Sequence, residues 1–252
     1  MNYWKDIKRI SYSLAVCDFK LRNEGTRLGF VWYLLNPLLL FTLLLLVFND
    51  RLRAGIESYP LYLFLGIILF NLFHKTTIEA TNGILHNAGL IKSIKFPGES
   101  VIISIVLRNL FEHLFEIIVF AIFLIAFNVS LVGIIFYLIV LVFLILFSYG
   151  VSLILSALTI YFIDLKNIWT FISRLLWFAT PIFYSIGGQT KLLTFSMFNP
   201  LYYFITISRD IIIYQRMPEL WMIGGAVIFT VAALAIGIFV FHLLRHKFAE
   251  MI

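Results

Sequence analysis

Long uncharged runs of apolar residues dominate the pattern along this chain. Residues 117–163 contain no Asp, Glu, Lys or Arg. That length holds two helices of about 20 residues, the length needed to cross the hydrocarbon core of a bilayer. Comparable apolar runs recur along the rest of the sequence. They predict an all-α integral membrane protein with six transmembrane helices, at residues 28–49, 60–81, 100–127, 134–160, 168–185 and 220–243.

The N-terminal segment has a different pattern. From Trp4 to Leu21, apolar side chains recur at spacings of three or four, and most lysines and arginines lie off that stripe. The pattern predicts an amphipathic interface helix within residues 1–27 that lies on the membrane surface. A helix that packs on a soluble partner is the alternative.

Residues 186–218 are too apolar for a plain loop and too interrupted for a span. Two short apolar runs meet there at Asn199 and Pro200. We expect a pair of re-entrant half-helices between the fifth and sixth spans, since irregular backbone at membrane depth must be buried in protein or face a cavity. Two further crossings are the alternative.

The positions of the basic residues predict the orientation. With a cytoplasmic N-terminus, thirteen Lys and Arg residues lie on the inner side and five on the outer side, among them Arg209 and Arg216. Because basic residues concentrate in cytoplasmic loops, this predicts a multi-pass protein of the cytoplasmic (inner) membrane with both termini cytoplasmic. The same rule accounts for the net charge of +6 without a nucleic-acid partner.

Composition narrows the chemistry. Charged residues make up 13% of the chain, against about 25% in soluble domains. The single cysteine, Cys17, excludes an intrachain disulfide. No Gly-Lys dipeptide occurs, so a phosphate-binding loop of the Walker type is absent, and no His, Cys and carboxylate residues have metal-site spacing. We therefore expect no catalytic residues, no metal and no cofactor on this chain, and an energy source on a partner.

The third expected span carries a charge stripe at Arg108, Glu112 and Glu116, which share one helix face. A charge at the bilayer centre costs about 2.5–3.5 kcal/mol on insertion scales, so these groups should face protein or water. A proton or substrate relay is one interpretation. An Arg–Glu pair that fixes helix packing is the one the pattern favours.

Aromatic residues gather near the span ends. An interfacial belt is one explanation. The other is a set of platforms for sugar rings along a substrate conduit. The candidates for such a conduit are Trp32, Tyr33, Trp177, Phe178 and Tyr184.

Four stretches together resemble one known family. They are DFKLRNEGTRLGFVWYLLNPLLLF (18–41), IKFPGES (94–100), RLLWFATPIFYS (174–185) and FNPLYYFITISRDI (198–211). Their order and spacing resemble the transmembrane subunit of ABC-2 type exporters, in particular the permeases for O-antigen, capsular polysaccharide and teichoic acid. The resemblance covers nearly the whole chain, with residues 28–252 as the transmembrane domain.

The resemblance implies a homodimer bound to two copies of a cytoplasmic ATP-binding-cassette ATPase, with ATP and Mg on that partner. It implies a lipid-linked glycan as substrate and a conduit lined by the first and fifth spans at the dimer interface, surrounded by membrane lipid. The external gate would contain Asn199, Pro200, Tyr202 and Tyr203. Coupling helices near 82–97 and 161–168 would contact the ATPase through His86, Leu90, Lys92, Lys95, Asp164 and Lys166.

Three other functions remain open at this point. The same architecture could export a drug or another lipid. A membrane-embedded transferase would need a His or Asp pair near a membrane face, which the pattern does not supply. A proton-coupled secondary transporter would use Glu112 and Glu116, although such folds often contain internal repeats and none is evident.

Overall fold

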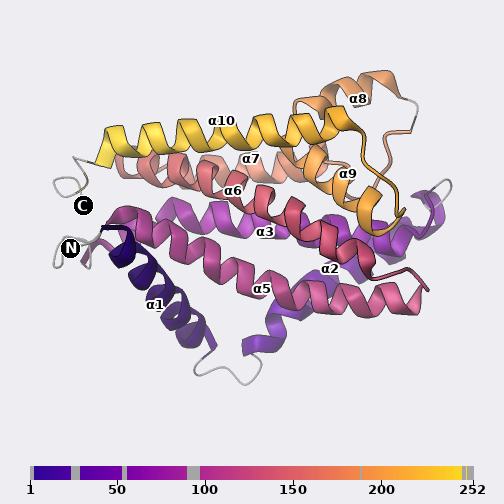
Figure 1. Ribbon diagram of the computed structural model, residues 1–252, viewed down its shortest axis with the longest axis horizontal. Helices are drawn as coiled ribbons and strands as arrows, with labels where there is room; N and C mark the ends of the chain where they lie inside the picture. The colour runs from indigo at the N-terminus through magenta and orange to yellow at the C-terminus, as the bar shows by residue number, and fades with distance from the viewer. Residues whose placement is uncertain are drawn as a thin grey trace.

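The computed structural model describes residues 3–23, 29–52, 56–89, 97–187, 189–245 and 248. All the regular secondary structure in this described part of the chain is helical, which confirms the all-α prediction (Figure 1). The helices are α1 (Tyr3–Asn23), α2 (Gly29–Leu52), α3 (Tyr59–His86), α5 (Gly98–Ala126), α6 (Val132–Tyr161), α7 (Leu165–Ala179), α8 (Thr190–Met197), α9 (Pro200–Ile212) and α10 (Leu220–Leu244).

Helix α3 is the centre of the bundle. It packs against α2, α5, α6, α7 and α9, and most of its side chains from Leu61 to Phe73 are buried. Helix α10 lies at the edge of the bundle and packs mainly on α6, with a smaller contact to α9. The core of the protein is therefore built around one helix rather than between two equal layers.

Four of the described helices are long and apolar enough to cross a membrane: α3, α5, α6 and α10. They correspond to the second, third, fourth and sixth expected spans. In α2 the apolar part is shorter, Leu34–Phe48. Helix α7 has 15 residues and is about 22 Å long, which is shorter than a hydrocarbon core of about 30 Å. Six complete spans are thus not evident from helix length.

The early end of α7 has a local cause. The fifth span is expected to reach residue 185, but the helix stops at Ala179 and residues 180–187 continue as irregular chain. Pro181 lacks a backbone donor and forces the residue before it out of the helical region. Thr180 accordingly has φ −91° and ψ 133°.

The two ends of the bundle differ (Figure 1). One end, which we call the terminal end, holds the start of α1, the ends of α3 and α10, and the connection from α6 to α7. The opposite end, which we call the far end, holds α8, α9 and the turn between α5 and α6. The segment predicted as re-entrant half-helices thus forms two helices at the far end, and its depth in a bilayer stays a prediction.

The N-terminal segment is helical as expected, but its packed face is rotated from the predicted stripe. Helix α1 packs on α5, and its buried side chains are Ile7, Ser11 and Ala15, spaced four apart. Cys17 and Leu21, which belong to the predicted stripe, are exposed. The location of α1 on a membrane surface stays a prediction.

Candidate functional site

An aromatic cluster joins α2, α7 and the irregular chain that follows α7. Phe183 is its centre: its ring stacks on that of Phe48, with centroids 5.5 Å apart, and the rings of Phe178 and Tyr184 meet it edge-on. The Tyr184 hydroxyl donates to the carbonyl oxygen of Phe178 at 3.2 Å. The Phe178 side chain is 66% exposed, so the cluster presents an aromatic surface beside α7.

The structure brings together only two of the five residues predicted for a conduit, Phe178 and Tyr184. Trp177 instead turns toward the bundle, where its ring meets Phe70 of α3 edge-on at 4.9 Å. Trp32 is exposed but lies sixteen residues before Phe48, about 24 Å away along α2. The side chain of Tyr33 lies outside the described residues. A conduit role for all five stays a prediction.

A buried arginine supports the irregular backbone after α7. Arg209 of α9 is 2% exposed and donates to the carbonyl oxygens of Pro181 at 2.6 Å, Ile182 at 2.9 Å and Tyr62 at 3.0 Å. Its guanidinium also lies over the Tyr62 ring, 3.3 Å from the centroid. Carbonyl groups freed from a helix must find donors when they are buried, and Arg209 supplies them.

The sequence interpretation counted Arg209 among the outer charges and missed this role. The available signal was its position in the middle of an apolar run, from Leu201 to Ile213. An arginine in such a run is seldom solvent-exposed and usually has a partner in the protein.

The residues predicted for an external gate hold the joint between α8 and α9. The Asn199 side chain caps α9 by accepting from the Leu201 amide at 3.0 Å, and its amide group donates to the Thr180 hydroxyl at 2.7 Å. Pro200 occupies the first position of α9, where its missing donor costs nothing. Tyr202 and Tyr203 are buried. All four residues make their described contacts within one subunit, and their role as a gate stays a prediction.

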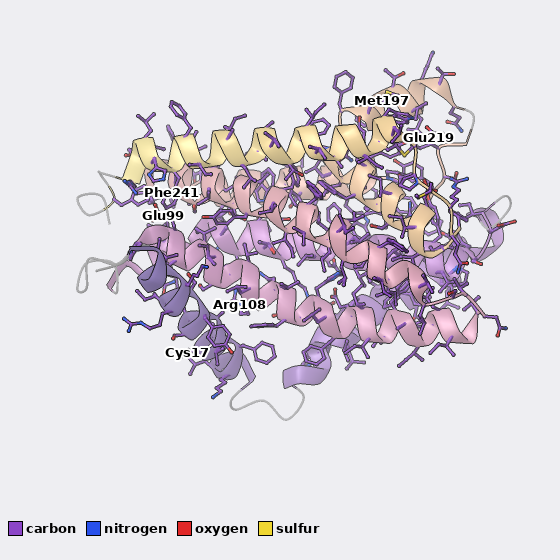
Figure 2. The ribbon with its side chains drawn as sticks, in the orientation of Figure 1. Cys17, Glu99, Arg108, Met197, Glu219 and Phe241 are labelled. Atoms are coloured by element: carbon purple, nitrogen blue, oxygen red, sulfur yellow. The ribbon has the colours of Figure 1, made fainter. Side chains whose placement is uncertain are left out.

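The charge stripe on α5 meets partners from two other helices, α1 and α3. Arg108, which is labelled in Figure 2, pairs with Asp18 of α1 at 3.2 Å and with Glu79 of α3. Lys75 of α3 lies 3.2 Å from Glu112 and 3.7 Å from Glu116. Lys75 was not among the residues predicted for this site. The two glutamates thus face a cation on the neighbouring helix instead of Arg108.

A histidine extends this second group to α6. His113 Nδ1 lies 3.0 Å from a carboxylate oxygen of Glu116, and His113 Nε2 lies 2.7 Å from the Tyr137 hydroxyl. We call the set Lys75, Glu112, His113, Glu116 and Tyr137 the lysine cluster. These contacts link α3, α5 and α6 within one subunit.

The residues predicted for ATPase coupling lie at the terminal end, as far as the structure describes them. His86 is exposed at the end of α3, and Asp164 and Lys166 are exposed where α6 is connected to α7. Leu90, Lys92 and Lys95 lie outside the described residues. At the same end, Arg245 donates to Glu99 at 3.1 Å and joins the C-terminal end of α10 to the start of α5.

Sequence comparison defines the class. The profile of the family "ABC-2 type transporter" matches residues 12–213, which is most of the chain. The chain belongs to the ABC-2 transporter family, and the resemblance noted from the four sequence stretches is confirmed.

The chain is also similar over nearly its whole length to proteins named as O-antigen export permeases. It is 27% identical over 243 residues to a Klebsiella pneumoniae protein named O-antigen export system permease protein RfbA, covering 93% of this chain and 92% of that protein. It is 25% identical over 244 residues to a protein of the same name from Myxococcus xanthus, covering 95% and 94%.

Proposed function

We propose that this chain is the transmembrane subunit of an ATP-driven exporter that moves a lipid-linked, O-antigen-like polysaccharide across the cytoplasmic membrane. Membership in the ABC-2 family, together with end-to-end similarity to proteins named O-antigen export permeases, is the observation that carries the proposal. The energy would come from a cytoplasmic ATPase in two copies, which binds ATP and Mg, because the sequence lacks a Walker loop.

The conduit would lie between two copies of the chain. Helices α2 and α7 expose large apolar side chains that no described helix covers: Leu39, Leu43, Leu46, Phe171, Leu175 and Phe178. An exposed apolar face of this size on a short, incomplete span fits a contact with a second subunit. The aromatic surface at Phe178 and Tyr184 would then lie at that interface, where it could contact sugar rings by dispersion.

The arrangement of the two ends supports the proposed orientation. The described parts of both predicted coupling segments, residues 82–89 and 161–168, lie at the terminal end, as do the start of α1 and the end of α10 (Figure 1). If that end is cytoplasmic, the ATPase contacts exposed residues such as Asp164 and Lys166, and α8 and α9 lie at the outer surface. The exposed Cys17 can report this orientation, since it is the only thiol in the chain.

Deletion and complementation test the function. We expect the deletion strain to lose surface polysaccharide and to accumulate lipid-linked glycan inside the cell, and the intact chain to restore display. Phe178→Ala should lower display per molecule of expressed protein, whereas Phe239→Ala on α10, where the side chain is similarly exposed at 68%, should not. Normal surface polysaccharide in the deletion strain would contradict the glycan substrate and would favour export of a drug or another lipid.

A further inference from the structure

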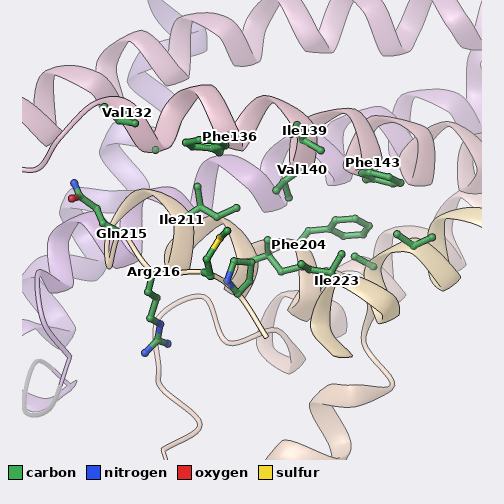
Figure 3. Close-up of a pocket in the computed structure, with 16 residues that line it drawn as sticks. Val132, Phe136, Ile139, Val140, Phe143, Phe204, Ile211, Gln215, Arg216 and Ile223 are labelled. Carbon is green, nitrogen blue, oxygen red and sulfur yellow. The ribbon is translucent and has the colours of Figure 1, made fainter. Parts of the chain in front are cut away.

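An apolar cavity opens between α6, α9 and α10 (Figure 3). Its volume is about 510 Å³, and sixteen described residues line it. Two of them, Gln215 and Arg216, have polar side chains, and the rest of the wall is aliphatic or aromatic apart from Gly133. Such a cavity has the size and the lining of a ligand site rather than of a packing defect.

The cavity arises because α6 and α10 diverge. The two helices touch near Gly150, where an added Cβ would lie 2.5 Å from the backbone of Ala233. Toward the far end they separate, as Figure 1 shows, and α9 enters between them. The cavity occupies the space that remains, between residues 132–143 of α6 and residues 223–227 of α10.

The cavity opens on an apolar outer surface of the bundle. On its α6 wall, Phe136 and Ile139 are 56% and 60% exposed, and Ile223 on the α10 wall is 40% exposed. Both helices are candidate membrane spans, and neighbouring side chains of α6 such as Leu138 and Val142 are exposed apolar groups as well. Water gains few hydrogen bonds from such walls, so a hydrocarbon chain from the bilayer is the favoured occupant.

A cationic side chain lies at the edge of these apolar walls. Figure 3 shows the Arg216 guanidinium pointing away from the cavity, and its side chain is 66% exposed. Asp210 accepts from Nε at 2.8 Å and lies 2.6 Å from Nη2. A guanidinium has five N–H donors, so it can hold this carboxylate and still donate to a phosphate oxygen. An apolar slot with a phosphate-binding group at its edge matches the two parts of a phospholipid.

We propose that this cavity binds one acyl chain of an anionic phospholipid, with the lipid phosphate at Arg216 and Gln215. The lipid would come from the leaflet at the far end of the bundle. Its acyl chain would contact Phe204 and Ile207 of α9, the helix that also carries Arg209, and so would brace the far end against the α6–α10 pair. This site does not depend on the proposed glycan substrate, because it lies apart from α2 and α7.

Photocrosslinking tests the site. The full chain, purified with any subunits that accompany it, is reconstituted in nanodiscs with phosphatidylglycerol that carries a diazirine on one acyl chain. Labelled peptides are identified by mass spectrometry. We expect labelling concentrated in residues 132–143 and 223–227. Val227→Trp fills the cavity and should reduce this labelling at least tenfold. Val231→Trp, at a position of α10 where the valine is 58% exposed, should leave the labelling unchanged.

Two further variants separate the outcomes. Ile139→Trp narrows the cavity from its opposite wall and should reproduce the loss if Val227→Trp perturbs folding. Arg216→Gln should remove the preference for phosphatidylglycerol over phosphatidylethanolamine while keeping the acyl-chain labelling. Labelling spread evenly over all exposed apolar surfaces, and insensitive to both tryptophans, would mean annular lipid only and would overturn the proposal. Crosslinked dimers joined through α6 and α10 would overturn it in favour of a second copy of the chain.

Discussion

Helices α3 and α10 are both long enough to cross a membrane, yet they have opposite surroundings. In the apolar 18-residue stretch that makes α3 a candidate span, 78% of the residues are buried. In the corresponding stretch of α10, 22% are buried. The buried helix is the less apolar of the two and carries Lys75, Thr76, Thr77 and Glu79, whereas the exposed helix is almost entirely apolar. In a membrane protein, the more polar helix belongs inside, because lipid accepts apolar side chains and cannot satisfy polar ones.

This difference indicates where the stability of the protein lies. Polar groups on α3 find partners on α5, α7 and α9: Lys75 in the lysine cluster, Thr77 through a 3.1 Å bond from Trp169, and the Tyr62 carbonyl through Arg209. Helix α10 is held mainly by close backbone contact with α6 around Gly150 and Gly237. Substitutions on α3 should therefore act through unpaired polar groups, and substitutions on α10 through steric overlap.

The largest effect is expected at Lys75. Lys75→Met leaves Glu112 and Glu116 without their cation, and breaking a buried ion pair in this way costs about 3–5 kcal/mol. The free energy of unfolding in mixed detergent micelles measures the loss. The double variant Lys75→Met/Glu112→Gln also removes the carboxylate that lies nearer to the lysine and should regain part of the loss. Equal stability of wild type and Lys75→Met would show that the cluster does not hold α3 in place.

Arg209→Met should have the next largest effect. It leaves the carbonyl groups of Pro181 and Ile182 without these donors, and an unsatisfied buried acceptor costs about 1–3 kcal/mol. We expect protease sensitivity to increase at residues 180–187 before the rest of the chain unfolds. Arg174→Met removes an exposed arginine of α7 and serves as the matched control. The same cleavage pattern in both variants would contradict the role of Arg209.

Overlap at the α6–α10 contact should cost a comparable amount. In Gly150→Val, the added Cβ meets the backbone of Ala233, and overpacking of this kind costs about 1–3 kcal/mol. Gly224→Ala, on α10 where nothing lies within 4 Å of an added Cβ, should leave the protein unchanged or slightly more stable. Thermal unfolding followed by size-exclusion chromatography distinguishes the two. A larger loss for Gly224→Ala would refute the close contact.

The smallest effect is expected on the exposed side of α10. Phe239 is 68% exposed, and Phe239→Leu should change the free energy of unfolding by less than about 0.5 kcal/mol. The same substitution at Phe64 of α3, which is 1% exposed, should cost clearly more, since it opens a cavity in the core. If both substitutions lowered the free energy of unfolding by the same amount, the difference in burial between α3 and α10 would be contradicted.

Apolar run length was enough to predict the helices α3, α5, α6 and α10, because a bilayer imposes a minimum length on any span. It could not predict that α7 stops at Ala179, since the helix there depends on Pro181 and on an arginine 28 residues farther along the chain. A single sequence indicates that burying a charge is costly but does not identify the partner that compensates.

The candidate site was less accessible to sequence reasoning than the fold. Lys75 is 37 residues from Glu112, and in the sequence it counts only among the basic residues of the inner side. The packing of α3 on α5 brings the two side chains to 3.2 Å. The aromatic residues were chosen for their type, and their direction depends on helix rotation: Trp177 and Phe178 are neighbours in sequence, but one packs on α3 and the other is exposed.

The central claim is that this chain works with an energising partner, and co-purification tests it most directly. The tagged chain is extracted from its native membrane in mild detergent after crosslinking, and the proteins that accompany it are quantified by mass spectrometry. The account predicts a soluble ATPase with a Walker motif in equimolar amount, attached through the terminal end near Asp164 and Lys166. A chain recovered without any ATPase after crosslinking in the membrane would contradict it.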